Sequence, residues 1–403
     1  MELFWLEHKK LWRKKIVKIC VLLCFVYCVI FGSILLFQWF GFGSSDDYTS
    51  AFGNNFDGYT VIKDSQEYAL SFGGELTDET LQQIVSDYQQ MEADGMEEEL
   101  EKTDWQIVNS WLGTLYPELR DTSNYKTMIS YVDPDKLTGF YERRQQVLDE
   151  FLEVSGQVGA EKEFLHQIER KVEKPFHYEW VEGWSTLLGS MVADLGVVMA
   201  LFLGIVLSSL FAGEWHDNTS TLVLTTRNGW GKIALAKILT GLAFTVELFA
   251  LLAVSNVISQ LFFMGTTGWD MPIQNIKLIA VAPMNMLQAE IYEYAFVLLG
   301  AIGFAGIVMF ISAAVKNNVL TLLLSLAVVY GPMMIAEYLP YEMQKALDLI
   351  PLVGSSTDIF RTNTFRIFGK LIWSPYLLIT IPVLIGILCM PFAIKSWSRR
   401  MKA

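Results

Sequence analysis

The sequence predicts an all-α polytopic membrane protein with six transmembrane helices, an N-terminal amphipathic interfacial helix and a mainly helical (α with minor β) extracytoplasmic domain. Apolar residues make up 52% of the 403 residues, more than the core of a soluble protein needs. Most of them lie in blocks long enough to cross about 30 Å of hydrocarbon. The one long polar stretch, residues 42–185, separates the first block from the second.

Residues 1–15 predict a cytoplasmic helix that lies on the membrane surface. Its apolar and aromatic residues recur at helical spacing, and its basic residues take the opposite face. The apolar face contains Met1, Phe4, Trp5, His8, Leu11 and Trp12, and the basic face contains Lys9, Lys10, Arg13 and Lys14. Basic residues next to a first transmembrane helix favour a cytoplasmic N-terminus.

Residues 16–41 form the first predicted transmembrane helix. The block is too long for the core of a signal peptide, and it lacks a cleavage site with small residues. Cys20, Cys24 and Cys28 are spaced to share one face of this helix, where cysteine acts as a small apolar side chain. With Cys389 they are the only cysteines, so we expect no disulfide framework.

Residues 42–185 form the predicted extracytoplasmic domain, which carries most of the acidity of the chain. The net charge of the chain is −13, and this segment holds 30 of the 43 acidic side chains. Such a charge excludes nucleic acid as a partner and favours solubility or cationic partners.

Several local signals predict the elements of this acidic domain. Residues 58–72 alternate in a strand-like manner. Thr77 is placed to cap a long amphipathic helix, and Asp133-Pro134-Asp135 predicts the start of a second helix. Gly156 is the expected end of that helix, and a third is expected over residues 160–173.

Residues 186–403 contain five further apolar blocks, which predict transmembrane helices 2–6. They lie at 187–212, 234–264, 293–315, 318–339 and 374–394. The positive-inside rule places the C-terminus and the coupling segment 213–237 in the cytoplasm, and the connections near 265–292 and 340–373 outside. We expect Gly300, Gly303 and Gly306 to permit close helix packing.

No catalytic motif is present, so we expect no enzyme. The sequence lacks G-x-x-x-x-G-K-[ST], H-E-x-x-H and G-x-S-x-G. Four histidines are too few to predict a histidine-based metal site. The prediction is therefore no catalytic residue, no metal and no cofactor on this chain.

The coupling segment is the most informative part of the sequence. Glu214 stands where the second helix leaves the membrane, and Arg227, Lys232 and Lys237 stand where the third helix enters it. Between them a short helix would present Leu222 and neighbouring apolar residues to a cytoplasmic partner, while the cations meet lipid headgroups or a carboxylate. The alternative is a tight loop whose charges only set topology.

This segment resembles the signature that follows the second helix of ABC-2-type permeases, the membrane subunits of ATP-binding-cassette exporters. The matching positions are Glu214, Thr219, Leu222, Leu224, Gly229, Lys232 and Lys237. Asn218 replaces the usual glycine, and the basic residue after Gly229 is displaced to Lys232. The surface helix, the six-helix count and the run from Gly74 to Glu79 also resemble members with a large external domain.

The resemblance implies a plasma-membrane exporter for an amphipathic substrate such as a peptide, drug or lipid. It implies a separate ATPase subunit that carries ATP and Mg, and a second permease copy, identical or related. A second interpretation stays open, in which the chain is a membrane sensor or scaffold whose external domain detects a ligand without transport.

Asp194 in the second helix and Glu247 in the third are acidic residues inside the apolar blocks. A charge there costs about 2.5–3.5 kcal/mol on insertion scales. Both are candidates for the substrate pathway or for interhelical pairing; the alternative is solvation in a water-filled vestibule.

Overall fold

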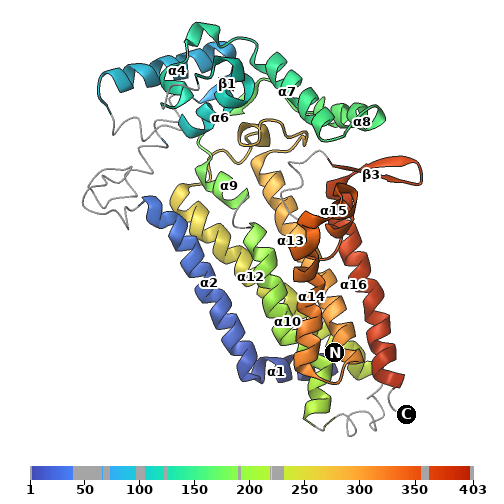
Figure 1. The fold of residues 1–403 in the computed structure, drawn as a ribbon. Coiled ribbons are helices and arrows are strands. Elements are labelled where there is room, and N and C mark those ends of the chain that lie inside the picture. Colours follow the sequence, from blue (N-terminus) through green and yellow to red (C-terminus); the bar gives the residue numbers. More distant parts are fainter. Residues whose placement is uncertain are drawn as a thin grey trace.

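The computed structural model describes residues 2–39, 66, 73–96, 105–121, 126–188, 192–217, 219, 231–354 and 363–399. In Figure 1 the long helices lie side by side, and the short helices of residues 73–188 gather at one end of this bundle. The first helix, α1 (Glu2–Arg13), lies at the opposite end. The predicted strand-like run at 58–72 falls outside the described residues, apart from Gln66.

Within the described residues, five helices are long and apolar enough to cross a membrane. They are α10 (Val192–His216), α12 (Lys232–Met264), α13 (Met286–Ala314), α14 (Asn318–Ile335) and α16 (Ser374–Arg399). They correspond to the five apolar blocks predicted after residue 186. The predicted first transmembrane helix corresponds to α2 (Lys15–Trp39), a helix of 25 residues that is not one of these five and whose side chains are undescribed from residue 31 onward.

Polar caps define where the long helices begin and end. Asn285 and Gln288 form a reciprocal capping box at the start of α13. Asn317 accepts hydrogen bonds from two backbone N–H groups in the first turn of α14. Gly265 ends α12 with a φ of 81°, a conformation that favours glycine. These caps fix where each long helix begins or ends, and so where the connection to the next one lies.

Glycines let α13 and α16 approach closely. A Cβ atom at Gly303 would lie 2.3 Å from the carbonyl oxygen of Pro382, and one at Gly306 would lie 2.5 Å from that of Gly386. Only residues without a side chain fit at such distances. The prediction that the glycines of this helix serve packing is therefore confirmed for this pair of helices.

The cysteine face of α2 packs against the bundle. Cys20, Cys24 and Cys28 are all buried in the core that α10, α12 and α13 share. Leucines and isoleucines on the other face of α2 are exposed. The shared face predicted from the spacing of four is confirmed.

Residues 73–188 form a helical region with a small sheet. Its helices are α4 (Asp78–Ala93), α6 (Trp105–Leu115), α7 (Phe140–Val154), α8 (Ala160–Glu169) and α9 (Glu182–Thr186). Short 3-10 turns cover Pro117–Leu119, Met128–Ser130 and Pro134–Lys136. Strands β1 (Gly74–Leu76) and β2 (Phe176–Tyr178) pair antiparallel, which the sequence analysis did not predict.

Of the two predicted helix starts in this region, the structure confirms one and contradicts the other. The Thr77 cap is confirmed, because its hydroxyl accepts a hydrogen bond from the backbone N–H of Thr80 at 3.2 Å. The prediction that Asp133-Pro134-Asp135 opens the second helix is wrong: it opens only a 3-10 turn. Helix α7 begins later because the Asp78 carboxylate of α4 accepts the backbone N–H groups of Gly139 and Phe140, at 2.7 and 3.0 Å.

The C-terminal ends of α7 and α8 lie close to their predicted positions. Helix α7 ends at Val154, and Gly156 follows with a φ of 74°, as expected of a stop. The third helix, α8, ends at Glu169 rather than near residue 173. The backbone N–H groups of Arg170 and Lys171 still bond back to the last turn, so the helix tapers into a turn before Pro175.

Two connections between the long helices pack against this region. The guanidinium of Arg144 donates hydrogen bonds to the carbonyl oxygens of Leu278 and Ala280, at 2.7 and 3.1 Å. Farther along, Thr364 donates to Gln157 at 2.8 Å. The elements of these connections are 3-10 turns at Ile273–Asn275 and Ala336–Tyr338, α15 (Tyr341–Leu347), and the hairpin of β3 (Thr364–Ile367) and β4 (Lys370–Trp373). Both connections thus lie on the same side of the bundle as residues 73–188, opposite α1 (Figure 1).

Candidate functional site

The ends of the coupling segment meet in a buried ion pair. Glu214 lies in the last turn of α10, and Lys237 lies in the second turn of α12. Their side chains are only 3% and 2% exposed, and the Lys237 ammonium donates to Oε1 of Glu214 at 2.8 Å. The two helix ends on either side of the segment are therefore joined directly.

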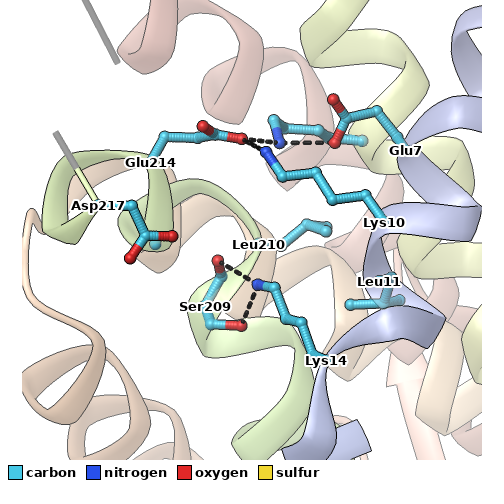
Figure 2. Close-up of a pocket in the computed structure, with 10 residues that line it drawn as sticks. Glu7, Lys10, Leu11, Lys14, Ser209, Leu210, Glu214 and Asp217 are labelled. Atoms are coloured by element: carbon cyan, nitrogen blue, oxygen red, sulfur yellow. Dashed lines mark hydrogen bonds and ion pairs between the residues drawn. The ribbon is translucent and has the colours of Figure 1, made fainter. Parts of the chain in front are cut away.

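Helix α1 supplies two more charges to this pair. Lys10 donates to the same Oε1 atom of Glu214 at 2.5 Å, and Lys237 also donates to Oε2 of Glu7 at 2.7 Å. Figure 2 shows the side chains of Glu7 and Lys10 pointing toward Glu214. We call Glu7, Lys10, Glu214 and Lys237 the charge cluster. It joins α1 to α10 and α12.

The local electrostatics explain why the cluster holds this composition. The C-terminal end of a helix carries a partial negative charge, so Glu214 adds an acid where cations are favoured. Two ammonium groups on that carboxylate reverse the local sign, and Glu7 balances the second ammonium. Two acids and two bases cancel, which is the condition under which the charges of Glu214 and Lys237 are tolerated with so little exposure.

The neighbouring lysines respond to these charges in opposite ways. Burial lowers the pKa of Lys10, but the hydrogen bond and charge of Glu214 outweigh burial, and the pKa is raised above its usual value. Lys14 instead donates to the hydroxyl of Ser209 at 3.0 Å. Burial and then the positive charges of Lys237 and Lys10 lower the pKa of Lys14. Lys10 thus stays charged in the cluster, and Lys14 binds a neutral partner.

The cluster is too tightly packed to bind a ligand. The cavity between its side chains, lined also by Leu210 and Asp217, measures about 10 Å³, which is room for about one water molecule. The arrangement therefore suits a mechanical connection between helices rather than a substrate site.

Of the other coupling candidates, the structure describes Thr219 and Lys232, and Thr219 reaches the cluster. Its hydroxyl donates to Oε2 of Glu214, so both oxygens of that carboxylate are engaged. Lys232 is exposed at the start of α12 and takes no part. Leu222, Leu224 and Arg227 lie outside the described residues.

Sequence reasoning missed the two residues that α1 contributes. Lys10 was assigned to the basic face that sets topology, and Glu7 was assigned no role. The available signal was an acid, Glu7, just before the basic residues of the first helix, together with an acid at the exit of a later helix. Two opposite charges at one membrane surface favour pairing, but spacing along the chain does not specify the partner.

The two candidates for the substrate pathway lie apart from this cluster. Glu247 faces α1, where it contacts His8 at 3.1 Å and accepts a hydrogen bond from the Trp12 indole at 3.0 Å. It therefore pairs helices in this structure. Asp194 belongs to α10, and its side chain lies outside the described part.

Metal-binding groups are not evident in the part of the chain that the structure describes, where no three His, Cys, Asp or Glu side chains gather around a common point. The fold and this site define a helical membrane protein whose first helix, α1, is bonded to two of its candidate spans. No family model matches the chain, and no curated protein or solved structure is significantly similar to it.

Proposed function

We propose that this chain is the transmembrane permease subunit of an ABC exporter, which moves an amphipathic substrate outward with energy from a separate ATPase. In this proposal α2 is a sixth span, both termini and residues 213–237 are cytoplasmic, and residues 42–185 lie outside the plasma membrane. Two permease copies, identical or related, complete the pathway.

The charge cluster is the observation that carries the proposal. The segment between Glu214 and Lys237 resembles the ATPase-contacting signature of ABC-2-type permeases, and the cluster bonds both ends of that segment to α1. A force applied to the segment by a nucleotide-driven partner would reach α1, α10 and α12 together. The absence of a P-loop from this sequence agrees with ATP chemistry on another chain.

Glu214→Gln tests this role. The amide keeps the shape of the side chain but removes the charge that holds Lys10 and Lys237. With the co-purified ATPase in proteoliposomes, we expect substrate transported per ATP hydrolysed to fall by at least about fivefold, the lower end of usual coupling between sites. Thermal unfolding of the same preparation checks that the variant is folded.

Asp217→Asn is the matched control, because Asp217 lines the same pocket yet is 62% exposed and, among the described residues, contacts His216. We expect it to leave the transport-to-ATP ratio unchanged. Equal ratios for Glu214→Gln and the native chain would remove the coupling role. Two results would favour the sensor interpretation over export. The purified chain would bind no ATPase, and a ligand of the external region would change the association of the chain with a regulator.

A further inference from the structure

Helix α13 carries two carboxyl groups inside a candidate membrane span. Glu290 and Glu293 lie within two turns of its start at Met286, at the end of the bundle near residues 73–188. Their side chains are 4% and 0% exposed. A spacing of three places them on one face of the helix.

Neither carboxyl group accepts a hydrogen bond of normal geometry among the residues that the structure describes, although the Tyr294 hydroxyl lies close to Glu290. The contrast with Glu214 is direct, since that carboxylate is equally buried and is engaged by two lysines and a threonine. A buried acid kept for helix pairing is expected to have such partners. The packing of this chain alone therefore does not explain why Glu290 and Glu293 are buried acids.

The surroundings of the two acids are polar and aromatic. The buried hydroxyl of Tyr294 lies near both Glu290 and Asn256 of α12, without a hydrogen bond of normal geometry to a described residue. The Tyr294 ring stands edge-to-face with that of Phe249, with centroids 6.1 Å apart. We call Asn256, Glu290, Glu293 and Tyr294 the polar layer between α12 and α13.

The surrounding cations do not neutralise this layer. Lys277, in the connection between α12 and α13, acts on Glu293 through its charge, but its own side chain is exposed to solvent. Two buried acids thus share neutral polar and aromatic surroundings, and one cation acts on Glu293 from a distance. A site of this kind is complementary to a positive ligand and repels an anionic one.

We propose that the polar layer binds the cationic group of an amphipathic substrate, such as an alkylammonium or a phosphonium. The carboxylates attract the charge, and the Tyr294 and Phe249 rings contact its apolar substituents. This inference rests on the proposed export function, because it specifies the substrate class. The layer is closed in this structure, so a ligand enters only when α12 and α13 move apart, as alternating access requires.

Direct binding to the purified full-length chain tests the inference without any ATPase. The probe is tritiated tetraphenylphosphonium, measured by scintillation proximity in detergent, with unlabelled dodecyltrimethylammonium as competitor. We expect Glu290→Gln with Glu293→Gln to weaken probe binding by at least about tenfold, as loss of charge-assisted contacts predicts. Glu337→Gln, the same change at an exposed acid near the same end of the bundle, should leave binding within about twofold.

Each variant must elute as a monodisperse peak in size-exclusion chromatography. If the double variant does not fold, the two single substitutions are compared with the native chain instead. If the native chain binds neither cation more tightly than the glutamine variants, the acids are simply protonated side chains and the inference falls. That result would leave the exporter proposal intact, because the Glu214→Gln experiment measures coupling and not cation binding.

Discussion

At the scale of single residues, the stability of a buried charged side chain depends on its partners. Removing one partner from a buried ion pair costs about 3–5 kcal/mol, because the other charge is left without compensation. Glu214 and Lys237 are in this position, and so are Arg144 and Glu169, whose side chains are 0% and 3% exposed and 2.6 Å apart. The first pair joins helices of the bundle. The second joins α7 to α8.

Glu169 predicts how stability depends on pH. Burial raises the pKa of the Glu169 carboxyl, but hydrogen bonds from Lys174 and Arg144 outweigh burial and hold the pKa below its usual value. A lowered pKa contributes stability that is complete above the unfolded value of about 4.3 and is lost as the pH falls through the folded value. We expect Glu169→Gln to be less stable than the native chain at pH 7, with the difference shrinking below about pH 4.

Thermal unfolding of the full-length chain between pH 7 and pH 3 measures this difference. Glu163→Gln is the matched control, since Glu163 lies on the same helix, is 54% exposed and pairs only loosely with Arg170 at 3.4 Å. Its effect should stay within about 0.5 kcal/mol at every pH. A difference for Glu169→Gln that does not change with pH would show that the carboxylate is not the stabilising species.

At the scale of elements, local sequence signals predict the helices, but they do not predict which helices contact each other. Long apolar blocks predicted all five candidate spans, and Thr77 predicted the start of α4, because hydropathy and capping act over a few neighbouring residues. The late start of α7 depends on Asp78, 61 positions before Gly139, and the charge cluster depends on Lys10, 204 positions before Glu214. No local pattern encodes such pairings.

The α13–α16 contact allows a test at this scale. Gly303→Ala places a methyl group against the carbonyl oxygen of Pro382, a backbone atom that has no rotamer to change. We expect the free energy of unfolding, measured by SDS titration in mixed micelles, to fall by about 1–3 kcal/mol.

Gly196→Ala in α10 is the control, because a methyl group there meets nothing within 4 Å. Both changes replace a helical glycine with alanine, so intrinsic helix propensity cancels in the comparison. Equal stabilities for the two variants would mean that α13 and α16 do not approach as closely as described.

For the whole molecule, the charge cluster and the polar layer lie toward opposite ends of one helix pair. Helix α12 carries Lys237 near one end and Asn256 toward the other, and its 33 residues span roughly 50 Å. Helix α13 is bonded to the end of α10 through Ser312, whose hydroxyl donates to the carbonyl oxygen of Ser208 at 2.7 Å. A displacement of the coupling segment would therefore be passed along α12 and α13 to the polar layer.

The proposed export function requires the charge cluster to face the cytosol and residues 73–188 to face outward. Single cysteines at Asp217 and Val154, side chains that are 62% and 88% exposed, report on the two sides. Three of the native cysteines are buried and the fourth is half-buried, so the unsubstituted chain provides the background.

A membrane-impermeant maleimide applied to intact cells is the most direct measurement. We predict that Val154→Cys is labelled in intact cells and that Asp217→Cys is labelled only after the membrane is permeabilised. Labelling of Asp217→Cys in intact cells, at the rate seen for Val154→Cys, would place the coupling segment outside, where no cytoplasmic ATPase reaches it.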